Sequence, residues 1–170
     1  VCFDSAAEKV FSTEDGSIIW YNNDLVFGNY VKILPAEFIP DPPPDSNGTD
    51  TAAGGTDTEL PENTPGSENI NDNIITYSDN ISGIKVTHSG HIIWWRDELL
   101  GDKWIKILYK DAAEPIKYDG KVKDVKINSA ETISWISGDQ IKILKKDTLE
   151  LSFINDKADY HAVTKNGIVA

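Results

Sequence analysis

The sequence lacks the residues that cross-link a chain. It has one cysteine, Cys2, and no methionine among 170 residues. A single cysteine excludes an intrachain disulfide and a cysteine-built metal cluster, so Cys2 either pairs between chains or behaves as a small buried hydrophobe. The chain starts with Val1, so we expect a processed form rather than a primary translation product. Cleavage of a secretory signal is one explanation for this start.

Long apolar runs and basic residues are also scarce. No run approaches the roughly 20 apolar residues that span a bilayer. The 16 basic residues face 28 acidic ones, for a net charge of -12 and a pI near 4.5. Such a field repels phosphate backbones and anionic lipids, so we expect neither nucleic acid nor membrane insertion. The partners that remain are a neutral glycan, a basic protein patch, a cation or copies of the chain itself.

Catalytic and metal-binding patterns are thin. His88 and His91 are three positions apart, which places them on opposite faces of a strand, and a solvated turn accounts for them better than a metal site. Residues 45–50 supply only part of a calcium loop. The nucleophile elbow, the phosphate-binding loop and the zinc helix motif are all missing. We therefore expect no enzymatic role, no catalytic residues, no cofactor and no metal.

What the sequence does contain is a short pattern written three times. Each copy has a lysine beside a β-branched residue, a turn, an apolar strand ending in tryptophan, a second turn and an apolar strand flanked by lysine. The copies span residues 9–34, 85–108 and 126–144, with Trp20, Trp94 and Trp135 as their tryptophans. This pattern predicts a repeated supersecondary unit.

Composition divides the chain into three parts. Residues 1–39 hold the first β unit, residues 40–73 form a tether rich in Pro, Gly, Asn and Thr, and residues 74–170 hold a β domain with the second and third repeats. Without the tether the repeats are nearly evenly spaced, at a period near 40 residues that is typical of four-stranded blades. The tether either lies across its own domain or is held by neighbouring subunits.

Strand signals dominate the local pattern. Runs rich in Ile, Val, Thr, Trp and Tyr are bounded by turn formers, and residues 104–110 alternate lysine with apolar side chains. The sequence therefore predicts an all-β fold. This fold is either a sandwich or a set of pseudo-repeated β-meander units with a long Pro/Gly/Thr-rich inserted loop.

The last third resembles part of an immunoglobulin-like β-sandwich. Residues 149–151 and 156–162, followed by a turn at 166–167, are similar to the E-to-F strand and turn of that family. The resemblance implies that Trp135 is the core tryptophan and that Tyr160 forms the tyrosine corner. Ala162 stands where the family has its second core cysteine. The resemblance also implies a sheet without its last edge strand, closed either by another chain or by an N-terminal strand.

Two hairpins resemble those of another family. Residues 93–105 and 20–31 each place a Gly turn before an aromatic and a β-branched residue. In this they are similar to the aromatic hairpins of trimeric bacteriophage fibre proteins.

The tryptophans carry the question of binding. Trp94 and Trp95 are adjacent, so in a strand they point to opposite faces, and only one joins a given core. The other lies on a second buried face, at a subunit contact or on an exposed platform. The interface or glycan-stacking candidates are Trp94, Trp95, Trp104 and Arg96, and the candidate glycosylation sites are Asn47 and Asn80.

These patterns predict a non-enzymatic structural subunit of an extracellular filament or virion appendage. It would assemble from copies of itself through β-strand and aromatic contacts, at the cell surface, in the extracellular space or on a virion. The alternative is a carbohydrate-binding or adhesin module that uses an exposed tryptophan to bind surface glycan. A third possibility, a small secreted enzyme, requires a cleft with convergent carboxylates.

Overall fold

The computed structural model contains almost only β-strands and turns. It describes residues 7–24, 28–39, 70–99, 101–146, 151–154, 157–165 and 167–169. Three four-stranded antiparallel sheets and one two-stranded sheet make up this part of the chain. Two 3-10 helices, η1 (Ala36–Phe38) and η2 (Ile70–Asn73), are the helical elements of the described residues. The predicted all-β class is confirmed.

Each four-stranded sheet is a meander, because its strands pair in chain order. We call these sheets units one, two and three. Unit one contains β1 (Ala7–Ser12), β2 (Ile18–Asp24), β3 (Gly28–Leu34) and β4 (Ile75–Ser78). Unit two contains β5 (Gly83–Val86), β6 (Ile92–Arg96), β7 (Trp104–Leu108) and β8 (Ile116–Asp119). Unit three contains β9 (Lys123–Ile127), β10 (Ile133–Ser137), β11 (Gln140–Leu144) and β12 (Leu151–Ile154), and β13 (Ala162–Thr164) and β14 (Gly167–Val169) form the last hairpin.

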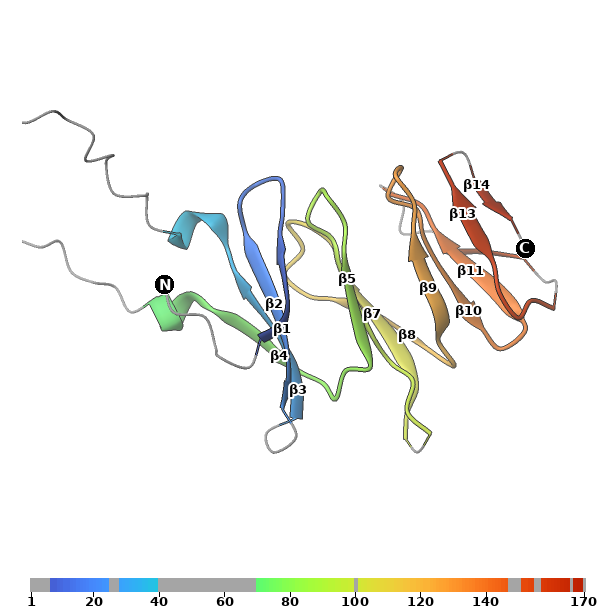
Figure 1. The fold of residues 1–170 in the computed structure, drawn as a ribbon, viewed down its shortest axis with the longest axis horizontal. Helices are drawn as coiled ribbons and strands as arrows, with labels where there is room; N and C mark the ends of the chain where they lie inside the picture. The colour runs from blue at the N-terminus through green and yellow to red at the C-terminus, as the bar shows by residue number, and fades with distance from the viewer. Residues whose placement is uncertain are drawn as a thin grey trace, which may run out of the picture.

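The units follow one another along the long axis of the molecule, with their faces turned toward each other (Figure 1). The hairpin β13–β14 lies beside unit three (Figure 1). Strands β5, β9 and β13 begin at residues 83, 123 and 162, so nearly equal lengths of chain separate their starts. The hairpin therefore stands where the first hairpin of a further unit would stand.

The strand register confirms the repeat. Trp20 pairs with Lys32, Trp94 pairs with Lys106 and Trp135 pairs with Lys142. Each tryptophan thus occupies the same place on the second strand of its unit, opposite a lysine on the third. This equivalence supports the predicted meander units.

The sequence alignment of the first strands needs a correction. Lys85 pairs with Ile93, whereas Lys9 pairs with Tyr21. The counterpart of Lys85 in unit one is Phe11, which pairs with Ile19. The sequence pattern aligned Lys9 with Lys85 and so placed the first strand of unit one two residues out of register. A shift of two residues keeps every side chain on its face of the strand, so the alternation of apolar and polar residues could not reveal it.

The Pro/Gly-rich segment is inserted inside unit one. β3 and β4 pair directly, from Tyr30 with Ser78 to Ile33 with Ile75, although the segment separates them in sequence. The predicted inserted loop is therefore confirmed, but the expected boundary at residue 74 divides strands of one sheet. Residues 40–69, with Asn47 and the question of what holds the tether, lie outside the described residues, as does Cys2.

Two hydrophobic clusters fill the spaces between the units. The middle sheet contributes to both, because alternate residues of a strand point to opposite faces. The cluster between units one and two includes Ile19, Tyr21, Val31, Ile33, Ile84, Ile92, Trp94 and Trp104. The cluster between units two and three includes Ile93, Ile105, Ile107, Val125, Ile133, Trp135 and Leu144. Unit two is therefore buried on both faces.

Face-to-face antiparallel sheets are compatible with the sandwich part of the prediction, but the details of the immunoglobulin-like resemblance differ. Trp135 is buried, as that resemblance implies. Tyr160 is 77% exposed, so it does not form a tyrosine corner, which requires its ring to pack into the sandwich. The units are also simple meanders, whereas that family uses Greek-key connections.

Candidate functional site

The structure places the predicted tryptophan candidates in the interior. Trp94 is fully buried and Trp104 is 6% exposed, both between units one and two. Trp95 is partly buried on the opposite face, against the cluster between units two and three. The adjacent tryptophans do point to opposite faces, and both faces are covered. Of the alternatives for the adjacent pair, the structure therefore shows a strand covered on both sides, and Trp104 is too buried to stack on a sugar ring.

The remaining predicted candidates lie near loops. Arg96, at the end of β6, is partly exposed and forms an ion pair of 2.8 Å with Glu98. Leu99, in the same loop, is 94% exposed. Asn80 is exposed in the turn after β4 and has a positive φ of 38°, so the amide of this sequon is accessible. Its glycosylation stays a prediction.

The two turn histidines differ in their surroundings. His88 is exposed in the β5–β6 turn, as expected. His91 is 8% exposed, and its Nδ1 accepts a hydrogen bond of 2.9 Å from the backbone N–H of Lys110. Its role is therefore to hold the chain after β7, which corrects the solvated position expected for it.

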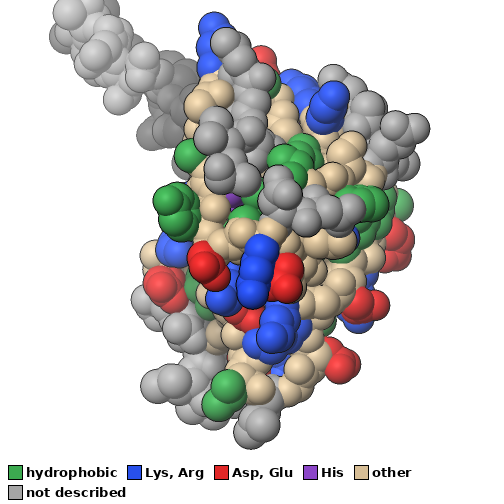
Figure 2. Space-filling model, turned by 90° about the vertical axis from the view of Figure 1, so that its right-hand side faces the viewer, with side chains coloured by type: hydrophobic (Ala, Val, Ile, Leu, Met, Phe, Trp, Pro, Cys, Tyr) green, Lys and Arg blue, Asp and Glu red, His purple; other side chains and the backbone are tan. Residues whose placement is uncertain are grey.

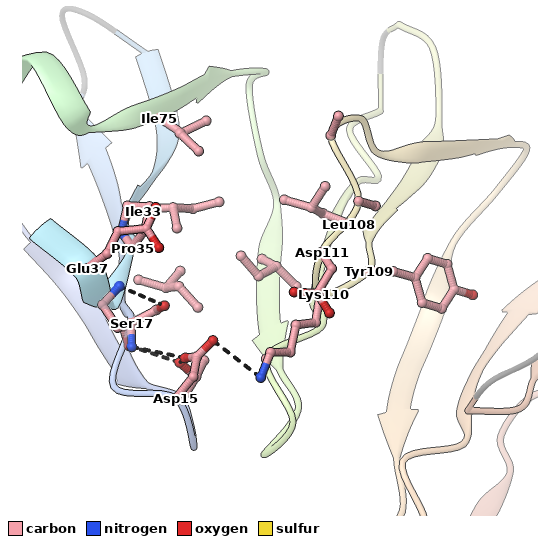
Figure 3. Close-up of a pocket in the computed structure, with 17 residues that line it drawn as sticks. Asp15, Ser17, Ile33, Pro35, Glu37, Ile75, Leu108, Tyr109, Lys110 and Asp111 are labelled. Atoms are coloured by element: carbon pink, nitrogen blue, oxygen red, sulfur yellow. Dashed lines mark hydrogen bonds and ion pairs between the residues drawn. The ribbon is translucent and has the colours of Figure 1, made fainter.

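A cleft of about 480 Å³ opens between units one and two (Figure 3). Its apolar wall consists of Ile19, Ile33, Ile75, Ile92 and Leu108. Ile75 pairs with Ile33 on β3, so its side chain lies on the face turned toward unit two, yet it remains 45% exposed. Open apolar surface is thus available between the two sheets. Sequence reasoning missed this site because its wall comes from strands of two units.

The rim of the cleft is acidic. Asp15, Glu37 and Asp111 line it together with one basic residue, Lys110. Asp15 Oδ1 accepts hydrogen bonds from Thr13 Oγ1 at 2.5 Å and from the N–H of Ser17 at 3.1 Å. These bonds, and to a smaller extent the charge of Lys110, hold the pKa of Asp15 well below its usual range. Its carboxylate is therefore ionised at neutral pH.

The walls of the cleft are tied to each other by contacts between units. The Asp15 carboxylate lies 3.4 Å from Lys110 Nζ, from the first unit to the second (Figure 3). The N–H of Glu14 donates to the carbonyl of His88 at 3.2 Å, between the two hairpin turns. The geometry is that of a preformed cleft.

A second polar cluster joins the last hairpin to unit three. His161 Nε2 lies 2.7 Å from Ser134 Oγ, and His161 Nδ1 lies 3.2 Å from Asp124 Oδ2. Lys126 Nζ lies 2.9 Å from the same carboxylate and also donates to the carbonyl of His161. The order carboxylate, imidazole, hydroxyl is that of a Ser-His-Asp arrangement.

Burial decides what this cluster does. The Ser134 side chain is fully buried and His161 is 1% exposed, so a substrate has no route to the hydroxyl in this conformation. Burial lowers the pKa of His161, and the carboxylate of Asp124 only partly opposes that effect. The imidazole is therefore neutral at pH 7. The cluster serves as a polar attachment of the residue before β13 to the third unit.

The outer strands of the units differ in charge. Strand β8 carries Lys117 and Asp119. Strands β4 and β12, with the sequences ITYS and LSFI, carry no charged residue. Within the described residues each of these two pairs with a neighbour on one side alone, and Phe153 of β12 is 54% exposed. Charges commonly protect sheet edges from pairing with other chains, and β4 and β12 lack that protection.

The described residues hold no group of three or more His, Cys, Asp or Glu side chains that could bind a metal. In the same part of the chain, no helix has the length and apolar character that crossing a membrane requires. Comparison with known proteins finds no family model, no curated protein and no solved structure that matches this chain.

Proposed function

We propose that the protein is a non-enzymatic structural subunit of an extracellular filament or virion appendage, joined to its copies by β-strand addition. The observation that carries the proposal is the pair of uncharged edge strands, β4 and β12. Each offers a row of backbone N–H and C=O groups on its outer side, which a strand from another chain can pair with. Burying the exposed Phe153 would add apolar contact to that pairing.

The arrangement of the units supports the same function. Each unit covers its neighbour by packing apolar residues, and unit two is buried on both faces. In repeat architectures of this kind, stability comes from the contacts between neighbouring units. Addition of further sheets or strands from other copies would extend the same principle.

Charge sets the conditions of assembly. With a net charge of -12, copies repel each other at low ionic strength. On the face seen in Figure 2, acidic and basic side chains are interspersed, and hydrophobic side chains also reach the surface. We therefore expect association to increase with salt, which screens the overall repulsion while leaving backbone pairing intact.

The two family resemblances bear on which kind of assembly the protein forms. The resemblance of the hairpins at 20–31 and 93–105 to trimeric fibre proteins favours a virion appendage. From the immunoglobulin-like resemblance the proposal keeps only the open sheet edge, which favours a filament built by strand addition. Extracellular location belongs to the same proposal.

Glycan binding is the second candidate. Its support no longer comes from Trp94 and Trp104, which are buried, but from the exposed ring of Tyr160. A glycan array would test it. Hits that Tyr160→Ala removes would favour an adhesin module, and an array without hits would exclude the glycans that it displays.

Size-exclusion chromatography with light scattering tests the assembly. We expect the natural chain to form oligomers that grow with protein and salt concentration. Ser152→Lys, at an exposed position of β12, should shift the population toward monomers. The matched control is Ser12→Lys on β1, an edge strand that already carries Glu8 and Lys9, and it should behave like the natural chain. A natural chain that stays monomeric up to its solubility limit at high salt contradicts the proposal.

A further inference from the structure

We infer that the cleft between units one and two binds a short extended segment of a partner protein, in which an apolar side chain stands next to lysine or arginine. This goes beyond the proposed function, because it assigns a heterologous partner to side chains between units one and two, Ile75 of β4 among them, and not to backbone pairing at the outer edges of β4 and β12. The first observation in its support is the exposed apolar surface inside the cleft. Ile75 lies on the face that looks toward unit two, but it is 45% exposed and lines an open space of about 480 Å³.

The size and shape of the cleft fit side chains better than a large ligand. Its volume lies toward the lower end of the range of about 300–1,000 Å³ that is usual for small-molecule pockets. Its base is formed by the aliphatic side chains that continue the core between the two sheets. An inserted leucine or isoleucine would complete the packing that Ile75 leaves open.

The negative charge of the rim favours a basic residue next to the apolar residue of the partner segment. Asp15, Glu37 and Asp111 provide three carboxylates against the one ammonium of Lys110. Lys110 lies 3.4 Å from Asp15, and Glu37 and Asp111 are both exposed at the mouth. A basic side chain entering beside the apolar one would meet this surplus negative charge, and an acidic one would be repelled.

The cleft is held open before any partner arrives. Ser17 Oγ accepts a hydrogen bond of 3.2 Å from the N–H of Ala36, which fixes one wall. The ion pair of 3.4 Å between Asp15 and Lys110 joins the two walls. Because these loops are already ordered, binding carries no entropy cost for ordering them, which favours affinity from a small contact area.

A second copy of this chain is a poorer occupant. Among the described residues, Ile105-Lys106-Ile107 of β7 has both isoleucines fully buried in the core. Val10, which follows Lys9 and is 55% exposed, is held in the pairing of β1 with β2. The counterpart Ile141 on β11 is also fully buried. A segment from a different protein fits the site without unfolding a sheet.

Titration of the isotope-labelled full chain with capped peptides, followed by NMR, tests the inference. The probe is acetyl-Leu-Lys-Leu-amide, and the comparison peptides are acetyl-Leu-Glu-Leu-amide and acetyl-Ser-Lys-Ser-amide. We expect the first peptide alone to shift the backbone signals of Gly16, Gly90 and Ala112, which line or adjoin the cleft. Added salt should weaken the binding, because the rim charges become screened.

Variants of the rim locate the site. Glu37→Lys should weaken binding by about tenfold or more, because it reverses one of the rim charges. Glu8→Lys, an exposed glutamate on β1 outside the cleft, is the matched control and should leave the affinity unchanged. Ala113→Lys should block the mouth, and the exposed Ala130→Lys should not.

Several results would overturn the inference. These are equal binding of the Leu-Glu-Leu peptide, equal binding of the Ser-Lys-Ser peptide, shifts that centre away from the cleft, or the same loss of affinity in the control variants. Absence of any shift at saturating peptide would also overturn it. None of the variants lies on β4 or β12, so the oligomeric state reports on the proposed assembly separately from peptide binding.

Discussion

The ring of Tyr77 lies 5.2 Å from the ring of Trp94, across the boundary between units one and two. Tyr118 and Trp135 repeat the contact at 5.6 Å between units two and three. In both cases the tyrosine of a fourth strand meets the tryptophan of the next unit's second strand, 17 positions later in the sequence. The aromatic pair is therefore part of the repeat and links each unit to its successor.

This relationship leads to a prediction about stability. Tyr77→Leu and Trp94→Phe should each lower the free energy of unfolding by about 1–3 kcal/mol, because both rings pack in the interface between units. The double variant should reveal a coupling of about 0.5–1.5 kcal/mol, as expected for aromatic pairs. Urea denaturation measures all three. Tyr160→Leu is the control, since that tyrosine is exposed. Simple additivity would show that the rings do not act as a pair.

Gly83 gives a second prediction. A Cβ at this position would lie 2.3 Å from Cζ2 of Trp95, far inside van der Waals contact. Gly83→Ala should therefore destabilise the fold by about 1–3 kcal/mol, since a well-packed site cannot take extra volume. In a Trp95→Leu background the same change should cost less, because the clashing ring is gone. Thermal unfolding of the four proteins decides the matter, and an equal cost in both backgrounds would contradict it.

Glu131 links units two and three and predicts an acid-dependent loss of stability. Its carboxylate accepts hydrogen bonds from the N–H of Ser89 at 2.7 Å and from its hydroxyl at 2.5 Å, and it lies 2.9 Å from Lys146 Nζ. Burial opposes ionisation, but these contacts outweigh it and lower the pKa of Glu131 from 4.5 to about 2. Its stabilisation is therefore complete above pH 4.5 and is lost as the pH falls toward 2.

Urea denaturation across that pH window measures the effect. Glu131→Gln should be less stable than the natural chain at neutral pH, and its stability should depend less on pH between 4.5 and about 2. The control is Glu114→Gln at an exposed position. A Glu131→Gln protein with the same pH slope as the natural chain would argue against this role.

The buried position of His161 leads us to expect a second pH dependence of the unfolding free energy, at higher pH than that of Glu131. Burial lowers the pKa of this imidazole from 6.5, so the folded state disfavours the protonated form. The unfolded chain gains a proton as the pH drops through 6.5, while the folded chain resists. The stability present above pH 6.5 is therefore lost as the pH falls toward the lower pKa of the folded protein. Unfolding curves on both sides of that pH should show the decline.

Ser134 supplies the matched variant for this cluster. Ser134→Ala removes the hydroxyl that lies 2.7 Å from His161 Nε2 and leaves that nitrogen buried without this partner. We expect a loss of about 1–3 kcal/mol in unfolding free energy at neutral pH. Faster hydrogen exchange in β13 would accompany it if the cluster attaches the hairpin. Unchanged exchange there would refute that attachment.

The sequence by itself determined the strand content, the repeat and the strand on which each tryptophan lies. Alternation and turn residues are local properties, so they predict which side chains share a face without knowledge of what the face meets. The opposite orientations of Trp94 and Trp95 followed from their adjacency in this way. The inserted loop was also readable, because a segment poor in apolar residues cannot contribute to a core.

Only the tertiary structure decided what covers each face. Trp94 is buried and Trp95 partly buried because units one and three approach unit two from opposite sides. β4 belongs to unit one because β3 pairs with it across the insertion. The acidic cleft likewise combines residues of units one and two, and the His161 cluster joins the last hairpin to unit three. Contacts of this kind depend on how whole sheets stack, and packing between distant segments leaves no periodic signal in the local sequence.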